Sequence, residues 1–126
     1  MRVVGLDHLV LTVASIERSA GFHERVLGMT REVFGPERRT ALRFGPHKIN
    51  LHERGKEFEP KAASPTTGSA DLCLLVDGFD EIPSHLAAMG VFVLKGPVER
   101  TGARGVIRSY YIRDPDQNLI ELSHYP

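Results

Sequence analysis

The stretch LDHLVLTV, residues 6–13, decides the fold, because a related stretch, ADLCLLV, returns at residues 70–76. Both are rich in aliphatic and β-branched residues, which is typical of a β-strand, and both lead into a helical pattern. The segments INL at 49–51 and IEL at 120–122 correspond in the same way and lie in the last strand of each repeat. A strand–helix–three-strand unit leaves one sheet face that it cannot bury alone. The sequence therefore predicts an α+β fold of two paired βαβββ modules.

The repeat also sets the expected boundaries within a single domain over residues 1–126. Module one spans about 4–53, a polar connection spans 54–69, and module two spans about 70–126. The connection shows no sustained periodicity, and its length allows part of it to cover a cleft. We expect helices at about 16–27 and 79–89, and strands at about 6–13, 30–34, 40–44, 47–53, 70–76, 91–95, 107–113 and 119–124.

Composition excludes several classes of protein. Hydrophobic residues make up 41% of the 126 residues and charged residues 25%, as in globular chains. Sixteen basic and sixteen acidic residues give a net charge of zero, so there is no basic excess to bind nucleic acid. The apolar runs are too short to cross a bilayer, the first residues lack the apolar region of a signal peptide, and the single cysteine excludes an internal disulfide. We expect a soluble, cytoplasmic protein with no nucleic-acid or membrane partner.

Alternation along the strands sorts the side chains onto two faces of each sheet. The face toward the helices is uniformly apolar. The opposite face carries metal-coordinating groups on the first and last strands of the modules: His8, Asn50, His52, Asp71 and Glu121. A carboxylate on a partly buried sheet face is costly without a partner, and a divalent cation held by imidazole and carboxylate removes that cost. The pattern favours a metal site in which His8 and Glu121 face each other.

The same residues also have a structural interpretation. A single histidine in a strand is more often a hydrogen-bonded or surface residue than a metal ligand. Glu121 is also compatible with a solvated position on a one-sided sheet. From the pattern alone, both interpretations of this face stay open.

Two motifs give the chain a resemblance to a known family. The first is LDHLVLTV with a helix ending in VLGM at 26–29, and the second is YIRDPDQNLIEL at 111–122. Over its whole length the chain resembles the vicinal oxygen chelate superfamily, which includes glyoxalase I, fosfomycin and bleomycin resistance proteins and extradiol dioxygenases. The stretches KINLHE at 48–53, GKEFEPK at 55–61 and GSADLCL at 68–74 look like its glyoxalase-domain-containing protein 5 and bacterial virulence-protein group. The resemblance implies that the paired modules form a curved mixed sheet around a cleft that binds a divalent metal, namely Ni, Zn, Co, Mn or Fe(II).

The family's metal positions correspond to His8, Asn50, Asp71 and Glu121. His8 and Glu121 match the usual ligand types, whereas Asn50 stands where many members have a glutamate and Asp71 where many have a histidine. His52 lies two residues beyond Asn50 on the same face and is the replacement ligand that we favour. We therefore predict His8, His52 and Glu121 as metal ligands, with Asp71 as a fourth ligand or as a partner that orients a histidine.

Other residues have expected roles around this site. Arg43, at the end of a strand, is a candidate for holding an anionic substrate, with a plain surface arginine as the alternative. Of the neighbouring Tyr110 and Tyr111, one ring is expected in the core and the other, assigned to Tyr111, against the substrate. Cys73 has the parity of the cleft face and is interpreted as a small buried filler. Residues 101–105 form either a mobile lip over the site or a flexible loop.

Gln117 stands where this turn usually has a glycine, and a positive φ at a residue with a Cβ costs of the order of 1 kcal/mol. The remaining histidines are expected at the surface or on the helix side of the sheets: His23, His47, His85 and His124.

The leading functional hypothesis is a divalent-metal-dependent enzyme of glyoxalase type, a lyase or isomerase. Its metal would bind oxygens of a small substrate and stabilise a developing enolate or oxyanion, while Glu121 or Asp71 moves a proton. An iron(II) ring-cleaving dioxygenase is the second hypothesis, because two histidines and one carboxylate form a facial triad. The third is a non-catalytic protein that sequesters a drug or toxin. Family geometry also implies a homodimer, in which His8 of one chain can meet Glu121 of the other.

Overall fold

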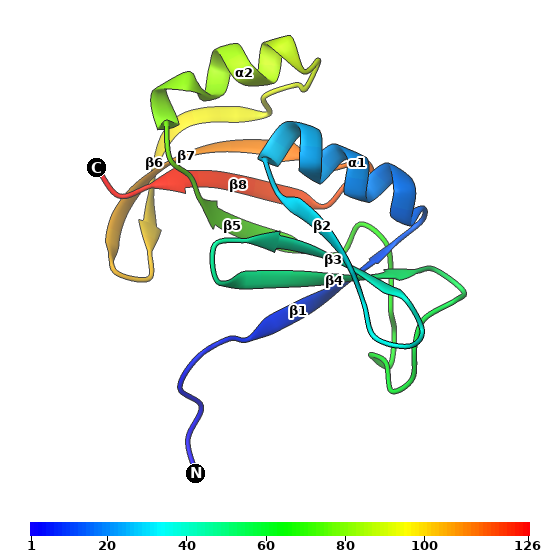
Figure 1. Ribbon diagram of the computed structural model, residues 1–126. Helices are drawn as coiled ribbons and strands as arrows, with labels where there is room; N and C mark the ends of the chain where they lie inside the picture. The colour runs from blue at the N-terminus through cyan, green and yellow to red at the C-terminus, as the bar shows by residue number, and fades with distance from the viewer. The chain divides into compact units, whose positions relative to one another are not determined.

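The computed structural model describes all 126 residues, which divide into two compact units, residues 1–67 and 68–126. Each unit has one four-stranded mixed sheet and an α-helix between its first and second strands (Figure 1). The predicted class is confirmed: the fold is α+β, with the strand–helix–three-strand order repeated once. The boundary between the units, at Thr67 and Gly68, falls inside the predicted connection.

The sheet of the first unit has the strand order β1-β4-β3-β2. Its first strand, at one edge, runs parallel to β4, and the other neighbours are antiparallel. The elements are β1 His8–Val13, α1 Ile16–Leu27, β2 Thr30–Phe34, β3 Arg39–Phe44 and β4 His47–Glu53. The helix has the predicted bounds, and each strand agrees with its prediction to within two residues.

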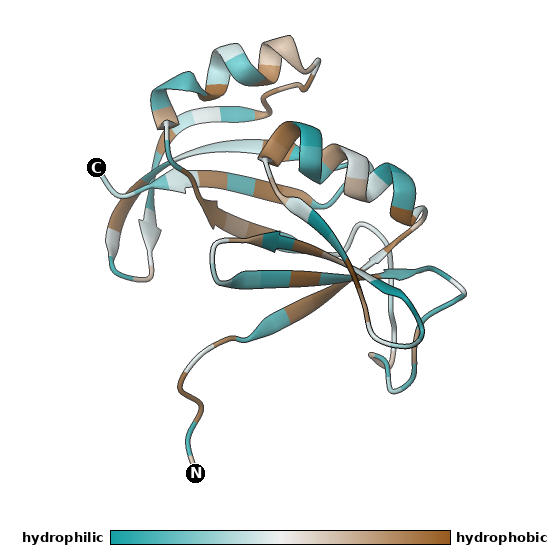
Figure 2. Ribbon diagram, viewed as in Figure 1, coloured by the Kyte–Doolittle hydropathy of each residue, from teal (hydrophilic) through white to brown (hydrophobic).

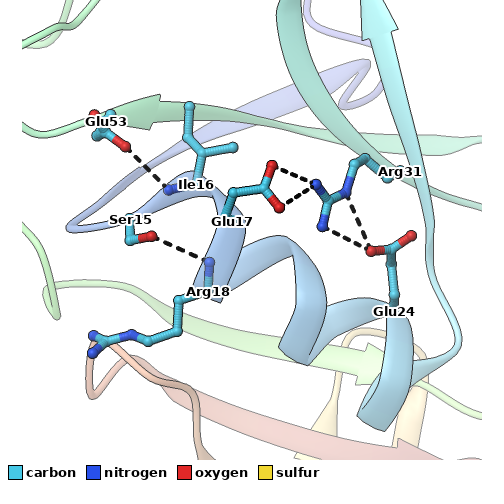
Figure 3. A network of polar contacts seen from close by, with 7 residues as sticks. All are labelled: Ser15, Ile16, Glu17, Arg18, Glu24, Arg31 and Glu53. Atoms are coloured by element: carbon cyan, nitrogen blue, oxygen red, sulfur yellow. Dashed lines mark hydrogen bonds and ion pairs between the residues drawn. The ribbon is translucent and has the colours of Figure 1, made fainter.

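The ends of α1 are fixed by their capping residues. Ser15 has an extended backbone, and its Oγ accepts a hydrogen bond from the Arg18 amide at 3.2 Å (Figure 3). Glu53 at the end of β4 accepts one from the Ile16 amide at 3.4 Å, which ties the start of the helix to the sheet. Gly28 ends the helix with φ 66°, a conformation that glycine adopts without a steric penalty.

A second polar contact joins α1 to β2. Nη1 of Arg31 donates to both carboxylate oxygens of Glu17 at 2.8 Å, and Nη2 donates to Glu24 at 3.0 Å (Figure 3). The bond to Glu17 is the largest cause of a raised pKa at Arg31. Because the Glu17 side chain is 82% exposed, each ion pair contributes at most about 1 kcal/mol.

The helix side of this sheet forms the core of the first unit. The sheet residues on this side that are at most 5% exposed are Leu11, Val13, Leu42, Ile49 and Leu51. They belong to β1, β3 and β4, and α1 contacts the last two of these strands as well as β2. The predicted apolar face toward the helix is therefore confirmed.

The sheet of the second unit repeats this arrangement with the order β5-β8-β7-β6, and β5 is parallel to β8. The elements are β5 Asp71–Leu75, a short 3-10 helix η1 Phe79–Glu81, α2 Ile82–Ala88, β6 Lys95–Gly102, β7 Gly105–Arg113 and β8 Leu119–His124. The predicted helix therefore begins as one tighter turn and continues as an α-helix. Pro83 occupies its first turn, where the missing N–H costs little.

Phe79 connects η1 to the helix side of this sheet. Its ring is stacked on His124 with a centroid distance of 4.0 Å, and the Tyr110 ring lies at 5.1 Å. Tyr110 is 9% exposed, whereas the neighbouring Tyr111 lies on the other face of β7 and is only partly buried. The expectation that this pair places one ring in the core is confirmed.

Two predictions in this unit were wrong. Residues 91–94 form no strand, and the strand instead spans Lys95–Gly102. Two of the four apolar side chains that suggested a strand are solvent-exposed, Phe92 at 77% and Leu94 at 42%. Residues 101–105 form neither a lip nor an open loop, because Gly102 pairs with Gly105 and closes a tight hairpin between β6 and β7.

The turn before β8 is held by buried polar side chains. Oδ1 of Asp114 accepts from the amides of Asp116 and Asn118 at 2.9 Å, and its Oδ2 accepts from Nδ2 of Asn118 at 2.8 Å. Oδ1 of Asn118 accepts in turn from the Ala70 amide just before β5. Gln117 sits within this turn with φ 70°, the conformation in which a residue with a Cβ carries a steric cost.

The chain before β1 has no regular structure and is strongly apolar. Met1, Val3, Val4 and Leu6 are each at least 71% exposed. Figure 2 shows hydrophobic brown stretches in this segment. No helix has the length and apolar content needed to cross a membrane.

Candidate metal and substrate site

The register between β1 and β4 fixes the polar face of the first unit. His8 is opposite Lys48, Val10 is opposite Asn50, and Thr12 is opposite His52. These residues share the face away from α1, as alternation predicted. The structure therefore brings His8, Asn50 and His52 onto one face, in that order along the sheet.

His8 is held in an orientation that leaves one ring nitrogen free. Its Nδ1 lies 2.7 Å from Oδ1 of Asp7, and the side chain is 43% exposed. The hydrogen bond from His8 is the largest cause of a lowered pKa at Asp7. A carboxylate that holds one imidazole nitrogen and leaves Nε2 open is the arrangement commonly seen behind histidines that bind metals.

His52 is engaged differently. It is 4% exposed, its Nε2 accepts a hydrogen bond from Nη2 of Arg39 at 2.9 Å, and its ring meets the Phe58 ring edge-on. Burial lowers the pKa of His52, and the positive charge of Arg39 lowers it further. Phe58 belongs to the predicted connection, so part of that segment covers this face of the first unit.

Spacing also separates His52 from His8. His52 lies four residues beyond Lys48, the partner of His8, which is about 13 Å along a strand. Asn50 lies only two residues beyond Lys48, or roughly 7 Å. On this sheet, Asn50 is therefore closer to His8 than His52 is.

Asn50 has an unsatisfied oxygen. The residue is 5% exposed, and its Oδ1 is buried without a hydrogen-bond partner. A buried acceptor left unpaired costs about 1–3 kcal/mol. An amide oxygen is a suitable ligand for a hard divalent cation, so the donor chemistry at Asn50 and His8 fits the implied metal.

In the second unit, Glu121 lies in a short chain of hydroxyl groups. Ser109 on β7 donates to Oε2 of Glu121 at 2.5 Å, and the Oγ atoms of Ser109 and Ser123 lie 2.7 Å apart. Sγ of Cys73 lies 3.3 Å from the Ser123 hydroxyl. These bonds orient the carboxylate and leave Oε1 without a hydrogen-bond partner, as a metal ligand requires. Ser109 is a functional candidate that the sequence alone did not identify. It could have been found only from the strand register, in which it lies opposite Ser123.

The expectation that Cys73 is a buried filler was wrong. It lies opposite Glu121 on the predicted face of β5, but it is exposed and is not a buried filler. The reason is that β5 is the edge strand of its sheet. Its sulfur is nevertheless partly shielded from water, which raises the pKa of Cys73, and the nearby charges of Glu121 and Asp71 raise it further.

The remaining predicted residues fall into two groups. Asp71 shares the face of Glu121, is exposed and makes no ion pair. Tyr111 lies directly opposite Glu121 and accepts a hydrogen bond from Nε of Arg100 at 3.0 Å. Arg43 is ion-paired with Glu32 on β2, so its charge is already balanced. Neither unit by itself gathers three or more histidine, cysteine, aspartate or glutamate side chains that could hold a metal ion.

The sequence and the structure of this chain are similar to those of several known proteins. A sequence model of the Glyoxalase/Bleomycin resistance protein/Dioxygenase superfamily matches residues 5–122. The virulence protein STM3117 of Salmonella typhimurium is 52% identical over 95% of this chain and 83% of its own length. The crystal structure of that protein superposes with a TM-score of 0.96 over the full length of both chains.

Two further proteins are similarly close. The glyoxalase domain-containing protein RDO1 of Mycosarcoma maydis is 52% identical over 99% of this chain and 70% of its own length. An integron cassette protein from the mobile metagenome of V. cholerae is 53% identical and has a TM-score of 0.96, covering all of this chain and 98% of its own.

Proposed function

This chain belongs to the Glyoxalase/Bleomycin resistance protein/Dioxygenase superfamily, and we propose that it is a divalent-metal-dependent enzyme of glyoxalase type acting on a small oxygen-bearing substrate. The observation that carries the proposal is the hydrogen bond that holds one ring nitrogen of His8 and leaves the other without a partner. Asp7 holds Nδ1 of a side chain that is 43% exposed on the polar face of β1, and Nε2 makes no hydrogen bond. Glu121 has a matching state, with one oxygen held by Ser109. His8 and Glu121 are the two ligands that we propose first.

Asn50 is the third ligand in this proposal, in place of the predicted His52. Its buried Oδ1 needs a partner and lies nearer to His8 along the sheet. The Nε2 of His52 is already bonded to Arg39, and a guanidinium beside a dication is electrostatically unfavourable. A set with one histidine also makes the ring-cleaving dioxygenase less well supported, since that chemistry uses two histidines and one carboxylate.

The cation, when bound, would stabilise negative charge that develops on a substrate oxygen. The residues of this chain supply the remaining parts. Ser109 keeps Glu121 in one orientation, and Oε1 would accept a proton from the substrate once it is displaced from the cation. Asp71, exposed on the same face and free of ion pairs, is the second carboxylate available for proton transfer. Tyr111 stands opposite Glu121 and is a contact for the substrate.

We further propose that the protein is a homodimer. The exposed apolar segment formed by residues 1–6 is continuous with β1, which is an edge strand with a free side. An unpaired edge beside exposed apolar residues is a surface that natural proteins normally cover. Sedimentation of the whole chain and of a variant lacking residues 1–6 tests this, with a monomer expected for the truncated chain.

Metal titration tests the main proposal. Protein stripped with a chelator is titrated with Ni, Zn, Co and Mn, and with Fe(II) under anaerobic conditions. We expect about one ion per chain and at least a tenfold loss of affinity in His8→Ala and Glu121→Gln. Asn50→Ala should also weaken binding, whereas His52→Gln and the control His47→Ala, which changes an exposed histidine at the start of β4, should not. Stoichiometry below about a tenth of an ion per chain contradicts the proposal.

Activity assays then separate the reaction classes. The metal that binds is restored, and the protein is assayed with adducts of 2-oxoaldehydes and thiols, and separately with catechols by oxygen uptake. Turnover of the adducts that is lost in Glu121→Gln supports a glyoxalase-type reaction. Oxygen uptake with catechols instead identifies a ring-cleaving dioxygenase and contradicts it.

A further inference from the structure

Two cations on the polar face of the first unit have no carboxylate partner. Arg39 on β3 and Lys48 on β4 make no ion pair, whereas Arg43 on the same face is neutralised by Glu32. Burying or crowding cations without a counter-charge is unfavourable. These two positive charges therefore favour the binding of an anion between them.

Both cations lie against one aromatic ring. Nζ of Lys48 is 3.9 Å from the centroid of the Phe34 ring, and the Arg39 guanidinium carbon is 5.7 Å from it. In the register, Lys48 is opposite Arg43, Phe34 is opposite Arg39, and Ala41 lies midway between these positions on β3. Both cationic groups therefore lie within 6 Å of the Phe34 centroid, and the small side chain of Ala41 lies between the strand positions from which they extend.

The guanidinium of Arg39 is held in place by its neighbours. His52 accepts from Nη2, and the Phe58 ring lies 4.6 Å from the guanidinium carbon. Nε of Arg39 is buried and has no hydrogen-bond partner. A guanidinium fixed between rings, with an unsatisfied donor, is prepared for an oxyanion, because less side-chain entropy is lost when the ligand binds.

The acidic residues near this position do not fill this role. Glu32, directly opposite Ala41, is ion-paired with Arg43. Asp7, whose pKa the charge of Lys48 helps to lower, is hydrogen-bonded to His8. The negative charge of Glu57 raises the pKa of His52. However, Oε2 of Glu57 accepts a hydrogen bond from the Gly55 amide, and Glu57 makes no ion pair with Arg39. The local charge is therefore not balanced within the unit.

We propose that Arg39 and Lys48 bind a small oxyanion, a carboxylate or phosphate group, above Ala41. This anion site extends the proposed function. It rests on that function only in identifying the bound anion as part of the substrate. Asn50 is opposite Ala41, so the anion would be held beside a proposed metal ligand. The substrate class is then a small molecule with one anionic group and a second oxygen nearby. His52 is a positioning residue, because it acts through Arg39.

The test measures anion binding by chelator-treated protein, so that it is independent of the metal. The probes are lactate and inorganic phosphate, with the neutral lactamide as control, in a low-chloride buffer. Melting temperature and the nitrogen resonance of the Arg39 Nε are followed. We expect saturable changes with at least one anion and none with lactamide, and the anion that binds more tightly identifies the group.

Three variants locate the binding. Arg39→Gln keeps a donor for His52 but removes the charge, and Lys48→Gln removes the other charge. Each should raise the half-saturating anion concentration at least tenfold. Arg25→Gln, which removes an exposed charge from α1, is the matched control and should change it by less than about twofold. Circular dichroism confirms that each variant is folded.

The outcomes are distinguishable from those of the metal titration. Equal binding in all three variants, or equal effects of lactate and lactamide, overturns the anion site whatever the metal result. Anion binding that depends on Arg39 and Lys48 in a protein that takes up no metal supports the site while the proposed function fails.

Discussion

Nε2 of His52 accepts a hydrogen bond from Nη2 of Arg39 at 2.9 Å, so the lone pair of this buried imidazole is directed at a cation. A protonated His52 would lose this bond and place two positive charges together. Burial is the larger reason that the pKa of His52 lies below its ordinary value, and Arg39 adds to it. The pair therefore has consequences for stability as well as for ligand binding.

Stability is expected to fall as the solution is acidified through the ordinary pKa range of histidine. Between the lowered pKa of folded His52 and its ordinary value near 6.5, the unfolded chain binds a proton that the folded chain does not. The contribution of neutral His52 is complete above this window and is lost as the pH falls through it. Urea unfolding at pH 7.5, 6.5 and 5.5 measures the effect. His52→Gln, which can still accept from Arg39, should flatten the dependence, and His47→Gln should not.

Asn118→Ala should destabilise the protein by about 2–4 kcal/mol. The change removes two hydrogen bonds from a residue that is 2% exposed and leaves the Ala70 amide and a buried oxygen of Asp114 without partners. Chemical denaturation of the variant measures the loss. A cost below about 0.5 kcal/mol would mean that water replaces the amide in this turn.

Gln117→Gly should raise stability by up to about 1 kcal/mol. Gln117 has φ 70°, and glycine removes the steric cost of a Cβ in this conformation, although it also makes the unfolded chain more flexible. Gln117→Ala keeps the Cβ and is the matched control, with no gain expected. Melting temperatures of the three proteins test the argument, and equal gains in both variants would contradict it.

Cys73 should react slowly with alkylating reagents in spite of its exposure. Partial shielding of the sulfur from water and the neighbouring carboxylates raise the pKa of the thiol, so little thiolate is present at neutral pH. The rate of iodoacetamide modification at pH 8 is expected to be below that of a free cysteine. Glu121→Gln removes one of the negative charges and should increase the rate; a decrease would show that the carboxylate does not repel the thiolate.

Ser109→Ala should weaken metal binding about tenfold without removing any proposed ligand. Its hydroxyl donates to Oε2 of Glu121 and fixes the carboxylate, and partners of this kind typically contribute 10–100-fold to metal affinity. Calorimetric titration measures the change. Ser84→Ala, at the start of α2, is the control.

The sequence predicted most of the fold because its apolar residues follow the periods of the elements they form. β1 shows clear alternation of buried and exposed residues, and α1 has clear capping residues. The bounds of both were predicted to within two residues. β6 was misplaced because its residues are mostly polar and include Gly96 and Pro97, as an edge strand permits. Only the register could show its position.

The candidate site was predicted in part for a related reason. Alternation assigned His8, Asn50 and Glu121 to the polar faces, since parity depends only on position in a strand. It gave no information on which partner each side chain finds. The bonds from Arg39 to His52 and from Ser109 to Glu121 join different strands, and they became visible only with the register.

The parallel pairing of the first and last strands within each unit has a consequence for synthesis on the ribosome. β1 pairs only with β4, 40 residues later from His8 to Lys48, so the first strand must wait until the whole unit has been made. Once Thr67 has emerged, every strand of the first sheet is present, and this half of the chain has all the partners it needs to fold vectorially before the second half is translated. The order of translation thus separates the two repeats in time and disfavours pairing of β1 with β8, the strand that corresponds to its partner β4.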